Sequence, residues 1–162
     1  MSLARTLWIT LVFLILVVLH YSLRPMLAWR ASPDFLVIAL LLVAVRTRPG
    51  VAALAGFALG LLADSLTPEA FGAGALAMTI VGFAASWLKA AFFADDIALN
   101  GAFIFGGKWL FDAIFLLVEH RLRGTELLAQ LLLWSPLAAA MTAVAGLLVL
   151  LAIRPVFRAR HA

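Results

Sequence analysis

Long apolar runs separated by short polar turns dominate the hydrophobicity pattern of the chain. A membrane-spanning helix needs about 20 mostly apolar residues to cross a hydrocarbon core roughly 30 Å thick. The candidate spans are 6–23, 33–47, 50–66, 72–93, 97–118 and 127–153. Because the turns between them are brief, no room remains for a separate soluble domain. The pattern predicts an all-α, six-transmembrane-helix bundle that forms a single domain over residues 1–162.

The second span is the shortest, and its length leaves open whether it crosses the whole membrane. Its uncharged core, FLVIALLLVAV, would cover about 16 Å as a helix. A full crossing then requires extension to Arg48, with arginine snorkelling or local thinning of the bilayer. The start is better specified, because Ser32 suits a cap, Pro33 suits the first helical position and Asp34 suits the positive end of the helix dipole.

Composition strengthens the membrane interpretation and narrows the chemistry. The chain is 66% hydrophobic and 12% charged, whereas soluble domains are about 45–50% apolar and about 25% charged. The absence of cysteine excludes disulfides and cysteine-ligated metals. The three histidines show no ligand spacing, and His20 is expected at the membrane interface. We therefore expect no cofactor and no metal site.

The basic residues predict the orientation in the membrane and argue against a nucleic-acid partner. They lie mostly near segment ends, as expected for anchoring against an anionic leaflet. One side of the six-span arrangement carries seven of them: Arg5, Arg46, Arg48, Lys89, Arg154, Arg158 and Arg160. The other side carries four: Arg24, Arg30, Arg121 and Arg123. The excess of positive charge places both termini in the cytoplasm.

Stripes of small residues run along the third, fourth and sixth spans. Small residues let helix backbones approach closely, which in lipid replaces the hydrophobic drive between helices. Two uses remain open, packing inside the bundle and a surface for the helix of a partner protein. The candidate packing or interface residues are Gly56, Gly60, Asp64, Gly74, Gly82, Ala138, Thr142 and Gly146.

Two ionisable residues fall inside the fifth span. Lys108 and Asp112 are four residues apart and share one helical face. A lone charge at the bilayer centre costs about 2.5–3.5 kcal/mol on insertion scales, so pairing or a polar interior is expected. The pair could fix this helix in the bundle, face a ligand or partner, or relay protons or ions.

Asp64 ends the third span and has several possible environments. It could lie in water at the interface, or contact Lys108 or the start of the fourth span. Neither Asp64 nor Asp112 stands in a Gly-x-Gly-Asp or Tyr-Asp context, and Ser86 has no mid-span histidine to activate it. We therefore name no catalytic residue and expect no enzyme.

The order of these features resembles the rod shape-determining protein MreD family. The likeness is carried by the Pro-Asp opening of an apolar helix in SPDFLVIALLL, a short basic turn, and GFALGLLAD with its Gly-x-x-x-Gly-x-x-x-Asp spacing. A polar loop with glycine and then GALAMTIVGFAAS follow, and LLWSPLAAA and the basic tail RPVFRARHA resemble the family's last helix and end. The resemblance covers most of residues 32–162.

This resemblance implies a bacterial inner (plasma) membrane protein of the cell-elongation (Rod) complex. Such proteins are scaffolds without known catalysis, required for rod shape and lateral peptidoglycan synthesis. The implied partners are an MreC-like bitopic coiled-coil protein, with MreB, RodA and a class B penicillin-binding protein as complex members. The family's glycine-to-aspartate segment maps onto Gly56, Gly60 and Asp64.

The family also resembles the six-helix substrate-binding S components of energy-coupling-factor (ECF) vitamin transporters, which gives an alternative function. S components commonly dock their energising subunit through an Ala-x-x-x-Ala stripe on the first span. The first span here, LWITLVFLILVVLHYSL, contains no alanine. This absence favours the scaffold over the transporter.

Overall fold

A computed structural model gives the fold and describes residues 11–22, 32–66, 70–89, 96–120 and 124–158, with side chains as far as 152. Every regular element among these residues is helical, which confirms the all-α prediction. The helices are Leu11–Ser22, α2 (Phe35–Ala44), α3 (Pro49–Ser65), α4 (Ala73–Trp87), α6 (Ile97–Glu119), α7 (Thr125–Ala129), a π-helix (Gln130–Trp134) and α8 (Ser135–Arg158).

Two of the described helices are long and apolar enough to cross a membrane. They are Ile97–Glu119 and the continuous helix Thr125–Ala152, which joins α7, the π-helix and the first part of α8. The other apolar helices are shorter: Leu11–Ser22, Phe35–Ala44, Pro49–Ser65 and Ala73–Trp87. Membrane-crossing length is thus found for two of the described helices, and the six-span bundle stays a prediction.

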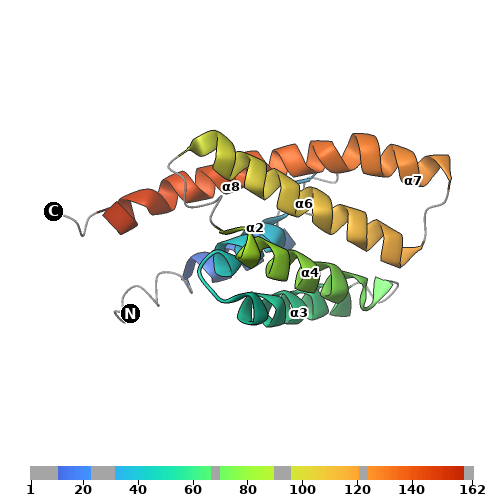
Figure 1. Ribbon diagram of the computed structural model, residues 1–162, viewed down its shortest axis with the longest axis horizontal. Helices are drawn as coiled ribbons and strands as arrows, with labels where there is room; N and C mark the ends of the chain where they lie inside the picture. The colour runs from blue at the N-terminus through green and yellow to red at the C-terminus, as the bar shows by residue number, and fades with distance from the viewer. Residues whose placement is uncertain (1–10, 23–31, 67–69, 90–95, 121–123, 159–162) are drawn as a thin grey trace.

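The helices form two pairs with α2 between them. Figure 1 shows α6 and α8 along one side of the molecule, α3 and α4 along the other, and α2 in the middle. The turn 45–48, Lys89 and the last turn of α8 lie at one end, here called the Lys89 end. The end of α3, the start of α4, the end of α6 and α7 lie at the opposite end, here called the α7 end.

Helix α2 is short because it fills the centre of the bundle rather than its full length. All of its residues except Val43 are buried, and Val37 and Leu40 are fully covered. Ten residues span about 15 Å, half of a hydrocarbon core. Because its surface is apolar on every side, it is stable only where other helices surround it. The expected crossing over 33–47 is therefore a half-length helix.

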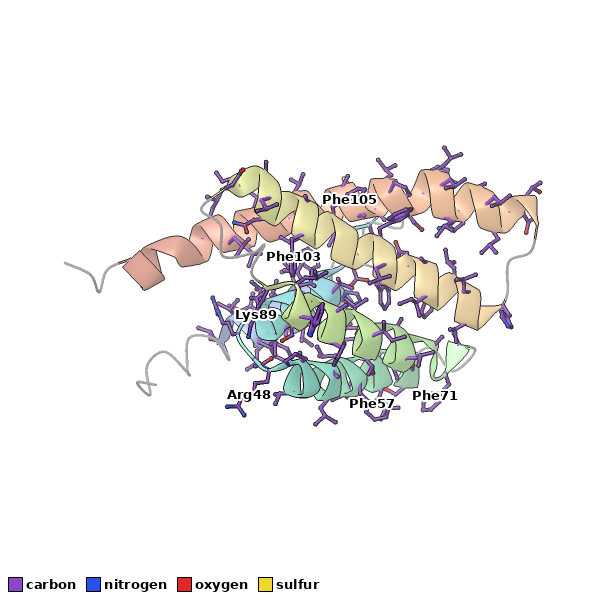
Figure 2. All side chains as sticks on the ribbon, viewed as in Figure 1. Arg48, Phe57, Phe71, Lys89, Phe103 and Phe105 are labelled. Atoms are coloured by element: carbon purple, nitrogen blue, oxygen red, sulfur yellow. The ribbon has the colours of Figure 1, made fainter. Side chains whose placement is uncertain are left out.

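The turn that follows α2 is hydrogen-bonded to the end of α4. The carbonyl of Thr47 accepts a hydrogen bond from the Ser86 hydroxyl at 2.7 Å and another from Lys89 Nζ at 3.4 Å. Figure 2 shows Lys89 and Arg48 at this same end of the molecule. The contacts fix where α2 turns into α3.

Helices α3 and α4 pack backbone against backbone. A Cβ atom added at Gly56 would collide with the carbonyl of Met78, and one at Gly60 would collide with the backbone of Gly74 and Ala75. From the other helix, a Cβ at Gly82 would lie 2.5 Å from the carbonyl oxygen of Ala52. The glycines thus set the separation of the two helices.

Candidate functional site

Lys108 is the centre of a buried charged network. It lies at the middle of the 23-residue helix α6 and is 6% exposed. Its Nζ atom donates to Asp112 Oδ1 at 2.6 Å and to Asp34 Oδ2 at 3.0 Å, and it also lies 4.7 Å from the centre of the Phe111 ring. One ammonium group therefore joins two carboxylates from different helices, which lowers the cost of burying all three charges.

Asp34 connects this network to two other elements, α2 and α8. Its carboxylate accepts from the backbone N–H of Val37 and so caps the start of α2. Its own backbone N–H donates to Thr142 Oγ1 on α8, and the Thr142 hydroxyl donates to the carbonyl of Ala138. Because Asp34 bonds Lys108 at the middle of α6, α2 begins at about half the depth of the bundle.

His20 also belongs to the network, contrary to its expected place at the interface. It is 3% exposed, and its Nδ1 atom lies 3.4 Å from Asp34 Oδ1. The interfacial prediction was wrong because it considered the position of His20 along its own helix. Burial arises from α2, which brings Asp34 against the end of that helix.

Asp64 caps the start of α4 from the end of α3. Its carboxylate accepts three backbone N–H groups, from Gly72 at 2.9 Å, Gly74 at 3.1 Å and Ala75 at 2.9 Å. The residue is 1% exposed. Of the environments left open by the sequence, the structure shows contact with the start of the fourth helical segment. A negative group is favourable there because the first N–H groups of a helix have no partner within it.

The charged network and the Asp64 cap share one cavity of about 570 Å³. Polar groups reach it from Asp34, Asp64, Lys108, Asp112 and Ser135, while its apolar wall includes the rings of Phe111 and Phe115. Leu66, Ala70, Glu119 and Gln130 also line it, so the cavity extends from the middle of the bundle to the α7 end. Its size is that of a small-molecule site.

A π-helix forms part of the cavity wall. The backbone N–H of Ser135 bonds to the carbonyl of Gln130, five residues earlier, and both residues line the cavity. Helix α6 holds this segment through the indole N–H of Trp109, which donates to the carbonyl of Leu131 at 3.2 Å. Such segments are rare and occur frequently at functional sites.

The remaining predicted residues lie at contacts within the chain. Gly74 faces the Asp64 carboxylate, which occupies the space of a Cβ atom. Gly146 on α8 faces Ile104 of α6, and Ala138 lines the cavity while accepting from Thr142. The structure thus brings Asp34, Lys108, Asp112 and Thr142 together, with Asp64 elsewhere on the same cavity. The glycines lie in separate helix contacts, Gly56 against Met78, Gly82 against Ala52 and Gly146 against Ile104.

The sequence interpretation missed the role of Asp34. The residue was assigned to the dipole of its helix, and the acids considered as partners of Lys108 were Asp112 and Asp64. The unusual signal was an acid at the start of an apolar segment too short to reach water on both sides. Among the described residues, no group of three or more His, Cys, Asp and Glu side chains could hold a metal ion.

Comparison with known proteins adds one finding. No curated protein and no solved structure matches the chain. The family model described as rod shape-determining protein MreD matches residues 2–153, nearly the whole chain. That family determines cell shape and is not a known enzyme family. The chain belongs to the rod shape-determining protein MreD family.

Proposed function

We propose that the protein is a non-catalytic membrane scaffold of the cell-elongation (Rod) complex. In this role it binds an MreC-like bitopic protein and links the MreB cytoskeleton to RodA and a class B penicillin-binding protein. The observation that carries the proposal is the family match over residues 2–153. The comparisons give no support to the alternative of an ECF vitamin-transporter S component.

The proposed location is the bacterial inner membrane, with residues 1–162 forming one multi-pass domain and both termini in the cytoplasm. Large apolar side chains on the outer surface support immersion in lipid, including Leu54 on α3 at 70% exposed, Phe83 on α4 at 50% and Leu148 on α8 at 62%. Basic groups at the Lys89 end support its assignment to the cytoplasmic side. In this arrangement α2 contributes half a crossing.

The glycine stripes are best explained as packing inside the protein. Gly56, Gly60 and Gly82 are buried between α3 and α4, so a partner's helix would have to separate the pair to reach them. We therefore place the contact with a bitopic partner on an outward apolar face. The bilayer itself covers the remaining outward faces.

Purification from native membranes in a mild detergent, followed by mass spectrometry, tests the scaffold function. We expect a bitopic coiled-coil protein together with peptidoglycan synthases. Recovery of paired ABC ATPases with a coupling membrane subunit would overturn the proposal.

Photo-crosslinking residues then identify the contacting face. Placed singly at Leu54 and at Leu148, they report on the outward faces of α3 and α8. The same group at Leu40, which is fully buried, is the matched control. We expect a crosslink to the partner from at least one outward position and none from Leu40. Equal crosslinking from Leu40 would contradict contact at an outward face.

A further inference from the structure

We propose that the cavity is a water-filled vestibule, which opens to solvent at the α7 end and stops at Lys108, near the middle of α6. Through this vestibule the buried charged network contacts the aqueous compartment on one side of the membrane. The inference goes beyond the scaffold function and does not depend on which proteins bind the chain.

The cavity joins the interior of the bundle to its surface. Its inner part is lined by Lys108, which is 6% exposed, and by Ala138, which is 8% exposed. At the α7 end the same cavity is lined by Leu66, which is 63% exposed, and by Glu119 and Gln130, which are half-buried. A single space that runs from exposed to buried residues has the form of a vestibule.

The short helix α2 explains why the cavity stops at half the depth of the bundle. The helix starts beside Asp34, and from there it occupies the centre of the molecule toward the Lys89 end (Figure 1). This half is packed with apolar side chains, including Val37 and Leu40 of α2 and Ile104 of α6. Among the described residues, none from the turn 45–48 lines the cavity, and Lys89 does not line it either. Helix α2 thus closes one half of the bundle, and the vestibule lies in the other half.

The polar groups on the lining favour water over an empty space or an acyl chain. Cavities that stay empty are apolar, whereas a polar cavity holds water molecules that each make about two to four hydrogen bonds. Ionisable groups in membrane segments face a polar interior or a water-filled cavity, because hydrocarbon cannot solvate them. This requirement is the same for either sign of charge, so it does not depend on the net charge of the lining.

Two lining carboxylates retain capacity to accept hydrogen bonds from water. An ionised carboxylate offers about four lone-pair positions. Asp112 accepts from Lys108 and from the Ser135 hydroxyl, and Asp64 accepts from three backbone N–H groups. At about 30 Å³ per water molecule, a cavity of about 570 Å³ holds up to about 20 of them. The space is therefore large enough for a continuous column of water.

Single cysteines test the vestibule directly, because the chain contains no cysteine of its own. Ala138→Cys places a thiol on the lining. At the same depth on α8, Ala139→Cys places it in the packed interior and Ala140→Cys on the outward face. The full-length chain in sealed vesicles is treated from one side with two membrane-impermeant methanethiosulfonate reagents, one cationic and one anionic. The reaction needs a thiolate, which forms in water and is disfavoured in apolar surroundings.

Two exposed positions report which side of the vesicle each end faces, Glu126→Cys at the α7 end and Arg48→Cys at the Lys89 end. We expect Ala138→Cys to react with both reagents about tenfold or more faster than Ala139→Cys and Ala140→Cys, and only from the side that labels Glu126→Cys. Equal rates at the three alanine positions would show a cavity without water and overturn the proposal. Reaction of Ala138→Cys from the Arg48 side, alone or in addition, would also overturn it.

A second pair, on α6, keeps the test decisive if Ala138→Cys fails to fold. Leu116→Cys places the thiol on the lining, whereas Leu117→Cys places it on an exposed neighbour outside the lining. We expect the same contrast, about tenfold or more in rate. Equal rates at these two positions would contradict a water-filled lining.

Filling the cavity distinguishes a vestibule from a transient opening of α8. Leu116→Trp, added to Ala138→Cys, narrows the space without removing a charge, and Leu117→Trp is its control outside the lining. We expect labelling of Ala138→Cys to slow about tenfold with the first tryptophan and to stay unchanged with the second. Equal labelling in the two double variants would mean that the reagent does not pass through the cavity, and would overturn the proposal.

Discussion

Two regions of this protein hold helices together by opposite means. Between α3 and α4, glycines remove side chains so that backbone meets backbone, as at Gly56 and the carbonyl of Met78. Between α2, α6 and α8, polar side chains make the contact, through Lys108, Asp34 and Thr142. The first contact depends on shape and the second on charge.

The difference teaches how each contact tolerates change. A close-packed glycine contact leaves no space for a larger side chain. When the two helices separate in lipid, however, no polar group loses a hydrogen-bond partner. A buried ion pair fixes position through specific partners, and loss of one partner leaves an uncompensated charge. The largest losses of stability are therefore expected in the charged region.

Removal of the Lys108 ammonium is expected to have the largest effect. Lys108→Met leaves Asp34 and Asp112 buried without their shared cation and should cost about 3–5 kcal/mol of the free energy of unfolding. Adding Asp112→Asn should restore only part of the loss because Asp34 remains, whereas adding Asp34→Asn as well should restore most of it. Asn at 34 still suits the cap of α2. Thermal unfolding in detergent measures the series.

One double variant of this series would contradict the role assigned to Asp34. If Lys108→Met with Asp112→Asn were as stable as the wild type, Asp34 would carry no part of the pairing. The charged region would then reduce to two residues on one helix.

Enlargement of a glycine in the first region is expected to rank second. Gly60→Leu forces α3 away from the backbone of Gly74 and Ala75 and should cost about 3 kcal/mol or more. Gly50→Leu is the control on the same helix, because no atom of the described residues lies within 4 Å of its added Cβ atom. The yield of monodisperse protein and its unfolding temperature report both variants. Equal tolerance of the two would show that α3 and α4 are not in close contact.

Two acids that cap helices provide the smallest expected effects. Asp64→Ala strands buried N–H groups at the start of α4 and should cost about 2–3 kcal/mol. Asp96→Ala removes the exposed cap of α6, which accepts one bond from Ala98, and should cost about 1 kcal/mol. Thermal unfolding of the two variants under the same conditions gives the ratio of their losses in stability. A larger loss at Asp96 would contradict the importance assigned to burial.

Local patterns in the sequence were sufficient for much of the fold. The apolar runs gave the order of the helices because main-chain groups in lipid must bond within their own segment. The Gly56–Gly60–Asp64 spacing placed three small or polar groups on one face, since residues four apart share a helical face. The i,i+4 spacing likewise put Lys108 beside Asp112.

Contacts between distant segments could not be read in the same way. The Lys108–Asp34 pair joins residues 74 positions apart, and the Asp34–Thr142 bond joins residues 108 apart. No periodicity within either segment contains that information. His20 was misjudged for the same reason, since its partner lies on a helix whose depth was unknown.

The sequence by itself determined the helical class, the lipid environment, the family resemblance and the pairing of Lys108 with Asp112. These follow from composition and from residue spacing within single helices, which act over a few residues. Only the tertiary structure decided that α2 is a buried half-length helix, that its Asp34 completes the charged network, and that this network lines a cavity. Those features depend on where separate helices stop relative to one another, and packing among all of them sets that depth.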